Sequence, residues 1–340
     1  MGQALAGPAA GLPAATGDFF ICDFLGPPPK DDMASMEHPL FTLSTRPDRR
    51  VLRYAHGAAE IEVTPSVKGL PTIHDKDVLI FCVSQLMAAV NAGRPTSPVL
   101  RLKAHDLLTA TNRETSGDGY RRLREALERL SGARIVTNLE TGGVETTRGF
   151  GLIDAWEILR ASKGGRMVLV TVTLSDWIYR SVLSKSVLTL SRDYFFLRKP
   201  LGRRVYEIAR KHCGRQAEWR VGLDTLLKKS GSTSPRRVFR RMIRDMAEED
   251  GLPDYTLLFG SDDILTVRAR GRLPAVEGEE PRLSAEVHER ARSAAPGYDS
   301  HWLAAEWLRH WRASGQPALR DPEAAFLAFA RSRAERAPQR

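Results

Sequence analysis

Five arginines lie close together in the stretch SPRRVFRRMIRDMAEED, Ser234–Asp250, and no acidic residue precedes Asp245. A guanidinium group binds phosphate and reads guanine O6 and N7 through two parallel hydrogen bonds. At about 100° of rotation per residue, the five arginines share one side of a helix. They are Arg236, Arg237, Arg240, Arg241 and Arg244. A solvated face normally mixes charges because like charges four residues apart repel. The pattern therefore favours a nucleic-acid surface over an ordinary solvated face.

The other side of this predicted helix is apolar. Its members are Val238, Phe239, Met242, Ile243 and Met246. An apolar stripe of this width is expected to pack on its own domain, which turns the arginines outward. Ser234 is a reasonable N-cap, and Pro235 suits the first helical turn.

Further basic residues flank the helix. From Thr225 to Arg244 there are seven basic residues and no acid. Lys228 and Lys229 end a preceding short helix, and a following β-hairpin carries Arg268, Arg270 and Arg272. These cations extend the predicted nucleic-acid surface beyond the helix. The predicted DNA-binding residues of this half are Lys228, Lys229, Ser232, Ser234, Arg236, Arg237, Arg240, Arg241, Arg244, Arg268 and Arg270.

The elements that position these residues occur twice. Residues 199–214, 218–221, 222–231, 234–250 and 255–270 indicate helix, strand, helix, helix and β-hairpin. Residues 75–93, 97–102, 103–112, 117–132 and 133–149 give the same order. An offset of 119 places Leu102 on Val221 and Tyr120 on Phe239 without a gap. This order is that of a winged helix, so two copies are predicted.

The first copy has a weaker basic face. Arg121, Arg122 and Arg124 are interleaved with Glu125 and Glu128. Lys103, Arg113 and Tyr120 could still meet phosphates, so these six positions complete the predicted DNA-binding set. A role in dimerisation or in DNA backbone contact is equally compatible with this helix.

The predicted fold class is α+β, with two tandem winged-helix domains and a C-terminal helical extension. The predicted boundaries are a flexible N-terminal tail at 1–35, domains at 36–188 and 189–274, and a helical segment at 282–340. In that segment Trp302, Trp307 and Trp311 lie at helical spacing. Core or interface packing is favoured for them over base stacking.

Composition supports a polyanionic partner. The 340 residues include 51 Lys and Arg against 41 Asp and Glu, a net charge of +10. Nucleic acid is the first expectation and an anionic membrane surface the second. The three cysteines are far apart, which disfavours a zinc ribbon or a disulfide framework and suits a reducing cytoplasm. No secretory signal is expected, and the longest apolar run is shorter than the roughly 20 residues that span a bilayer.

Catalysis is disfavoured. A rolling-circle nickase needs two metal-binding histidines flanking one residue, and none of the eight histidines is spaced in that way. A phosphate-binding loop of the form G-x-x-x-x-G-K-[ST] is also missing. We expect no enzyme activity, no cofactor and no metal. A membrane-surface role would need the apolar face of the arginine helix to be free.

Four segments carry a family resemblance. They are KDDMASMEHPLFTLST, IEVTPSVKGLPTIHDKDVLIFCVSQL, GYRRLREALERLSG and SRDYFFLRKPLGRRVYEIARKHCG. Together they resemble the RepA-type plasmid replication initiators, the replication initiator protein A family, over roughly Asp18 to Arg272.

The resemblance implies tandem winged helices that bind directly repeated origin DNA (iterons) and recruit host initiator and helicase proteins. It also implies that the second winged helix is the main reader. The residues in the major groove would be Ser234, Arg236, Arg237, Arg240 and Arg241, while Lys228, Lys229 and the hairpin arginines would hold phosphates. The first would contact DNA or form a homodimer that represses its own promoter. No catalytic residue is carried over. The alternative is a winged-helix transcriptional repressor without an initiation role, because both classes bind DNA alike.

Overall fold

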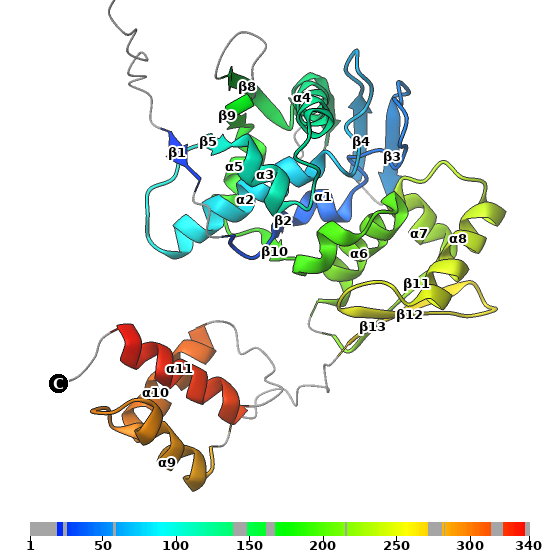
Figure 1. Ribbon diagram of the computed structural model, residues 1–340. Coiled ribbons are helices and arrows are strands. Elements are labelled where there is room, and N and C mark those ends of the chain that lie inside the picture. Colours follow the sequence, from blue (N-terminus) through cyan, green and yellow to red (C-terminus); the bar gives the residue numbers. More distant parts are fainter. Residues whose placement is uncertain are drawn as a thin grey trace, which may run out of the picture.

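The computed structural model describes residues 19–22, 26–56, 59–138, 148–160, 167–214, 216–270, 281, 283–313 and 322–336. Their fold is mixed α+β, as expected (Figure 1). Three parts follow one another along the chain. We call them the N-terminal part (to Thr189), the central part (Ser191–Arg270) and the C-terminal part (from Leu283).

The N-terminal part contains two four-stranded sheets and a small two-stranded one. Their orders are β1-β5-β9-β8, β3-β4-β6-β7 and β10-β2. The strands are β1 (Phe20–Ile21), β2 (Lys30–Asp32), β3 (Leu52–His56), β4 (Ala59–Thr64), β5 (Val99–Lys103), β6 (Arg134–Thr137), β7 (Arg148–Phe150), β8 (Ile153–Arg160), β9 (Met167–Leu174) and β10 (Val187–Thr189). The helices are α1 (Met33–Glu37), α2 (Lys76–Asn91), α3 (Ala104–Ala110), α4 (Gly117–Gly132) and α5 (Asp176–Leu183).

The central part is smaller and has one three-stranded sheet of order β11-β13-β12. It runs through the 3₁₀-helix η1 (Arg192–Phe196), α6 (Pro200–Cys213), β11 (Glu218–Gly222), α7 (Leu223–Ser230), α8 (Arg236–Glu249), β12 (Tyr255–Phe259) and β13 (Ile264–Ala269). The C-terminal part holds α9 (Ala285–Ala294), α10 (Ser300–Ala313) and α11 (Pro322–Arg336) around a core of their own.

The internal repeat is present in the helices. Adding 119 to the first residues of α3 and α4, 104 and 117, gives 223 and 236, where α7 and α8 begin. Residues 133–149 hold the two strands of the predicted hairpin, β6 and β7, which pair with each other, but this hairpin is not the counterpart of β12–β13. In the central part β11 pairs with β13, and its counterpart β5 pairs with β9. The equivalent hairpin is therefore β8–β9, whereas β6 pairs with β4 and β7 in the other sheet.

The predicted flexible N-terminal tail, residues 1–35, is too long. Residues 1–18 lie outside the described residues, but Lys30–Asp32 form β2 and pair with β10. The side chain of Asp32 accepts a hydrogen bond of 2.9 Å from the Ser35 backbone N–H and so caps α1. Asp31 and Ser35 are buried, so this stretch belongs to the folded body. The other predicted domain boundaries stay predictions.

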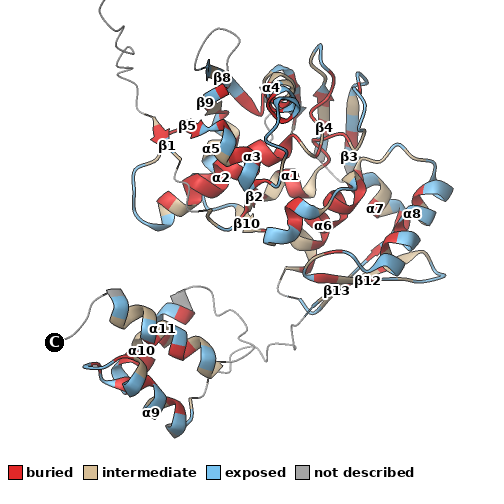
Figure 2. Cartoon of the chain, viewed as in Figure 1, coloured by how far each residue is buried: buried red, intermediate tan, exposed pale blue. Residues whose placement is uncertain are grey.

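A buried charge cluster joins the N-terminal and central parts (Figure 2 shows how fully α2 and α6 are buried). The Lys76 ammonium on α2 lies 2.6 Å from the Asp31 carboxylate and 3.0 Å from that of Glu207 on α6. The Tyr194 hydroxyl donates to Glu207 at 2.6 Å. All four side chains are at most 2% exposed. Such charges are stable inside a protein only when each has its partners in place.

Arg204 completes the cluster. Its guanidinium donates to Glu207 at 3.2 Å and to the backbone carbonyls of Met36 at 2.9 Å and Glu37 at 3.1 Å, where α1 ends. It also donates to the Lys229 carbonyl at 2.7 Å, in the last turn of α7. Carbonyls at helix C-termini carry partial negative charge and lack intrahelical donors. One arginine thus satisfies two helix ends from different parts of the chain.

We predict that Arg204→Met lowers the free energy of unfolding by about 3–5 kcal/mol. Removal of one member of a buried ionic cluster leaves its partners charged and unpaired. Urea unfolding followed by circular dichroism measures the change. Arg237→Met, an equal change at an exposed residue, should stay within about 0.5 kcal/mol. Equal stabilities of the two variants would contradict the role given to Arg204.

A second prediction concerns acid sensitivity at His212. Its ring stacks on Trp219 with centroids 4.9 Å apart, and burial lowers the pKa of His212 to about 4. The unfolded chain takes up this proton near pH 6.5 and the folded chain only near pH 4. Stability is therefore complete above pH 6.5 and is lost as the pH falls through 4. His212→Phe keeps the stacking but cannot titrate. Urea unfolding at pH 7, 5.5 and 4 should show a smaller acid loss for this variant than for the parent.

Candidate nucleic-acid interface

Helix α8 has three faces rather than the two expected from the sequence. Phe239, Ile243 and Met246 are buried in the central core, as predicted. Val238 and Met242 are instead 48% and 38% exposed. At about 100° per residue, Val238 lies roughly 105° and Met242 roughly 65° from the centre of the buried arc, so the core reaches only three of the five apolar side chains. The helix begins at Arg236, with Pro235 as its N-cap residue, so Ser234 is one position too early.

The third face carries all five predicted arginines. Arg237, Arg241 and Arg244 are exposed, and Arg241 reaches only Asp245, at 3.8 Å. Among the described residues, Arg237 and Arg244 have no ion-pair partner. An exposed pair at 3.8 Å contributes at most about 1 kcal/mol, so these three cations remain available to phosphates.

Two acids outside the helix hold the remaining two arginines. Arg236 donates to Asp224 of α7 at 2.7 Å and to Asp263 of the β12–β13 turn at 2.9 Å. Arg240 donates through Nε to the same Asp263 carboxylate. The hydrogen bond from Arg240 holds the pKa of Asp263 below its usual range. Sequence reasoning missed both acids, and the only available signal was the Asp262-Asp263 pair in a turn after a basic helix.

The turn between α7 and α8 fits closely against the N-terminal part. Gly231 has a φ of +67°, and a Cβ built on it would lie 2.7 Å from the Pro39 side chain. Both the backbone conformation and the close approach therefore require glycine. Ser232 and Ser234 follow and are partly exposed, with the Ser232 hydroxyl accepting from the Ser234 backbone N–H at 3.3 Å. Lys228 is exposed at the end of α7.

Three predicted phosphate-binding residues of this half are engaged elsewhere. Lys229 is 6% exposed and lies 3.3 Å from Glu37. Arg268 pairs with Glu218 at 2.8 Å. Arg270 donates to the Asp250 carbonyl at 2.7 Å, where α8 ends. The two hairpin arginines thus lie at the base of β12–β13, while its turn is acidic. Burial makes Lys229 unavailable to a phosphate, whereas Arg268 and Arg270 stay predicted phosphate contacts because their ion pairs lie at the surface. Arg272 lies outside the described residues.

The first copy places its predicted residues differently. Arg121 and Arg122 pair with Asp118 at 2.9 Å each, and Arg124 pairs with Glu128 at 3.0 Å. Tyr120 is 9% exposed in the core. Arg113 donates to Asp77 at 2.7 Å and to the His74 carbonyl, so its contact is internal. We remove Tyr120 and Arg113 from the interface. Lys103 is exposed where β5 meets α3.

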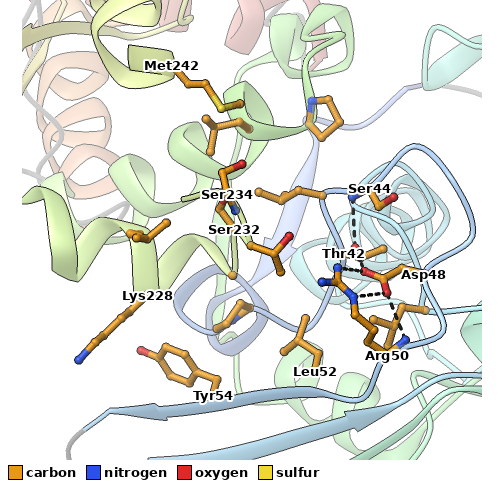
Figure 3. A pocket seen from close by; sticks show the side chains of 18 of the residues that line it. Thr42, Ser44, Asp48, Arg50, Leu52, Tyr54, Lys228, Ser232, Ser234 and Met242 are labelled. Atoms are coloured by element: carbon orange, nitrogen blue, oxygen red, sulfur yellow. Dashed lines mark hydrogen bonds and ion pairs between the residues drawn. The ribbon is translucent and has the colours of Figure 1, made fainter. Parts of the chain in front are cut away.

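A cleft of about 1130 Å³ lies between β3 and the α7–α8 turn (Figure 3). Leu52 and Tyr54 line it from β3, while Lys228, Ser232 and Met242 line it from the central part. Near its rim, Arg50 donates to Asp48 at 2.9 and 2.8 Å, which lowers the pKa of Asp48 to about 2. The cleft explains the exposure of Met242, because this face of α8 borders it rather than the core.

Within the described ranges, no group of three or more His, Cys, Asp or Glu side chains is placed to hold a metal ion. No helix in the same ranges is both long and apolar enough to cross a bilayer. The exposed arginine face of α8, opposite its buried apolar face, is the candidate site.

The exposed arginines of α8 form a basic surface that suits a polyanionic partner. The chain belongs to the replication initiator protein A family, whose model matches residues 30–257. A protein described as "Putative replication protein", from Wigglesworthia glossinidia brevipalpis, is 35% identical over 258 residues, which cover 74% of this chain and 94% of that protein. The replication initiator role expected from the sequence is therefore supported by family membership.

Two solved structures of domains 2 and 3 of RctB show a weaker likeness. They have TM-scores of 0.46 and 0.45 at 17% identity. The matches cover 69% and 70% of this chain and 95% and 96% of those chains. A likeness of this size bears on neither the site nor the function.

The arginine face makes a testable prediction. The double variant Arg240→Ala, Arg241→Ala should weaken binding to the preferred duplex by several kcal/mol, at about 1–3 kcal/mol per bidentate base contact. Fluorescence anisotropy with a labelled duplex measures the affinity. The matched control is Arg121→Ala, Arg122→Ala on α4, where Asp118 already pairs with both arginines. A larger loss in the α4 variant than in the α8 variant would place the reader in the first copy.

Proposed function

We propose that this protein initiates plasmid replication by binding directly repeated origin DNA with α8 as its reading helix. The observation that carries the proposal is the exposed arginine face of α8, set opposite a buried apolar face. Arg237, Arg241 and Arg244 remain free to meet phosphates and bases. Family membership supports the initiator role.

We propose further that the central part is a winged helix. The order α6, β11, α7, α8, β12, β13 and the sheet order β11-β13-β12 support this fold. In such proteins the second helix of the pair enters the major groove. The N-terminal part would be a second, modified copy, in which α4 corresponds to α8. Because its arginines are paired on their own helix, a role in backbone contact or in a homodimer suits α4 better than base reading.

The proposed activity needs no bond-breaking step. Binding and bending of origin DNA would expose it to host initiator and helicase proteins, which this protein would recruit. We accordingly propose that it is not an enzyme and that it acts on DNA in the cytoplasm. A transcriptional repressor with the same fold is the alternative, since autorepression uses the same contacts.

Footprinting of the purified protein on the DNA that flanks its gene tests origin binding. Protection that repeats at one or two helical turns supports binding to direct repeats. A plasmid carrying the protected DNA, with the protein supplied in trans, then separates the two roles. Replication that depends on the protein supports an initiator. Replication without it, together with repression of the flanking promoter, supports the repressor alternative.

Lys228 should contribute to binding without reading sequence. We predict that Lys228→Ala weakens binding to the protected repeat and to random duplex by the same factor. The slope of log affinity against log salt should become shallower by about 0.9, because one phosphate contact is lost. Anisotropy titrations at four salt concentrations measure both quantities. A loss confined to the repeat would mean that Lys228 contacts a base.

A further inference from the structure

The turn between β12 and β13 brings a single carboxylate to two arginines of α8. Asp263 Oδ2 accepts from Arg236 Nη2 at 2.9 Å, and Oδ1 accepts from Arg240 Nε. The side chains of Asp263, Arg236 and Arg240 are 24%, 49% and 30% exposed, so this contact lies at the surface. It sits in the first turn and a half of α8, the segment that a reading helix inserts into the major groove.

Asp263 is held in place by its backbone. Its carbonyl accepts from the Leu223 N–H at 2.9 Å, at the start of α7, and Gly260 N–H donates to the Ile264 carbonyl at 3.1 Å across the turn. Asp263 has a φ of +58°, a left-handed conformation that only glycine, asparagine and aspartate adopt readily. The carboxylate therefore comes from a rigid turn tied to the helix pair.

The atoms used by Arg240 leave its reading group free. Among the described residues, only Nε of Arg240 makes a hydrogen bond, and its acceptor is Asp263. Its guanidinium also lies 5.8 Å from the centre of the Phe259 ring. A guanidinium held through Nε keeps both terminal amines available, and a pair of donors is what guanine O6 and N7 require. The contact thus orients Arg240 without occupying its base-reading edge.

The same carboxylates cancel local charge. Arg236 and Arg240 carry two positive charges, and Asp224 and Asp263 carry two negative ones. A phosphate that approaches this cluster meets almost no net charge, whereas binding to random duplex depends on charge. A partner that offers guanine acceptors gains from the oriented donors. Specificity is the difference between the affinities for two partners, and a group that weakens binding of the wrong partner increases this difference.

We infer that Asp263 is a specificity-determining positioning residue, which orients Arg240 for guanine and lowers the attraction of this end of α8 for DNA of any sequence. The inference rests on the proposed function. It predicts opposite changes for the two kinds of DNA, whereas a residue needed only for folding would weaken binding to both.

The test uses the full chain and the variant Asp263→Asn. Asparagine tolerates the left-handed conformation, so the turn keeps its shape. At about 0.1 M salt, affinity for random duplex should rise roughly five- to tenfold, and the salt slope should steepen by about 0.9, because one more cation is uncompensated. Affinity for the footprinted repeat should fall, so the ratio of the two affinities should drop more than tenfold.

Two matched controls locate the effect. Glu218→Gln removes the same charge at the base of the hairpin, where Glu218 pairs with Arg268, and should leave the ratio unchanged. Asp224→Asn removes one of the two acids that Arg236 contacts and leaves Arg240 on Asp263, so it should raise affinity for random duplex while base reading by Arg240 persists. Replacing each guanine of the repeat with 7-deazaguanine reports that reading. At the guanine that Arg240 reads, this replacement should weaken binding of the parent protein but not of Arg240→Ala. It should also have no effect on Asp263→Asn, whereas it should still weaken binding of Asp224→Asn.

The outcomes separate this inference from the proposed function. If the parent protein prefers its repeat and Asp263→Asn keeps the same ratio and the same 7-deazaguanine penalties, the role of Asp263 is refuted while the proposed function stands. A parent protein that binds repeat and random duplex equally refutes both. A fall in both affinities, together with a lower free energy of unfolding, shows that Asp263 serves only the fold.

Discussion

The hydrogen bonds of the buried Arg204 guanidinium are the constraint on which the arrangement of this protein depends. They join the ends of α1 and α7 to Glu207, which in turn meets Lys76 of α2. Burying these charges costs free energy that only complete pairing offsets. A shift of α6 against either neighbour would leave carbonyls and carboxylates unpaired. The cluster therefore allows one placement of the central part on the N-terminal part.

That placement carries through to the surface of α8. The Lys229 carbonyl held by Arg204 lies in the last turn of α7, and Gly231 then reverses the chain against Pro39. Helix α8 starts five residues later, with one face in the core and one along the cleft beside β3. The arginine face lies outside both and is exposed. The orientation of the proposed reading helix is thus fixed by contacts that the partner never touches.

Sequence reasoning succeeded where the information was local. Helices α3, α4, α7 and α8 follow from apolar spacing, and their offset of 119 residues recurs in the structure. It failed where partners are distant in sequence. Strand β5 pairs with β9, but β6 and β7 lie between them in the sequence and form a hairpin of their own. That nearer hairpin has the same sequence signature as a wing. Arg113 meets Asp77, and Lys229 meets Glu37, across 36 and 192 residues. Two cations that looked free are therefore internal, and no periodicity reveals such pairs.

The two copies differ most in where the acids stand. On α4 the partners of Arg121 and Arg124 are Asp118, Glu125 and Glu128, which belong to the same helix. Any DNA that approached those arginines would meet the acids at the same depth, so the face attracts phosphates less strongly than α8 does. On α8 the partners of Arg236 and Arg240 come from α7 and from the hairpin turn. The exposed arginines Arg237, Arg241 and Arg244 therefore stay available to DNA. Because Asp224 and Asp263 do not belong to α8, they can orient Arg236 and Arg240 without neutralising the rest of the arginine face. One scaffold can then serve two tasks, and the proposed sequence reader is the copy in which the acids that pair with Arg236 and Arg240 lie outside the helix.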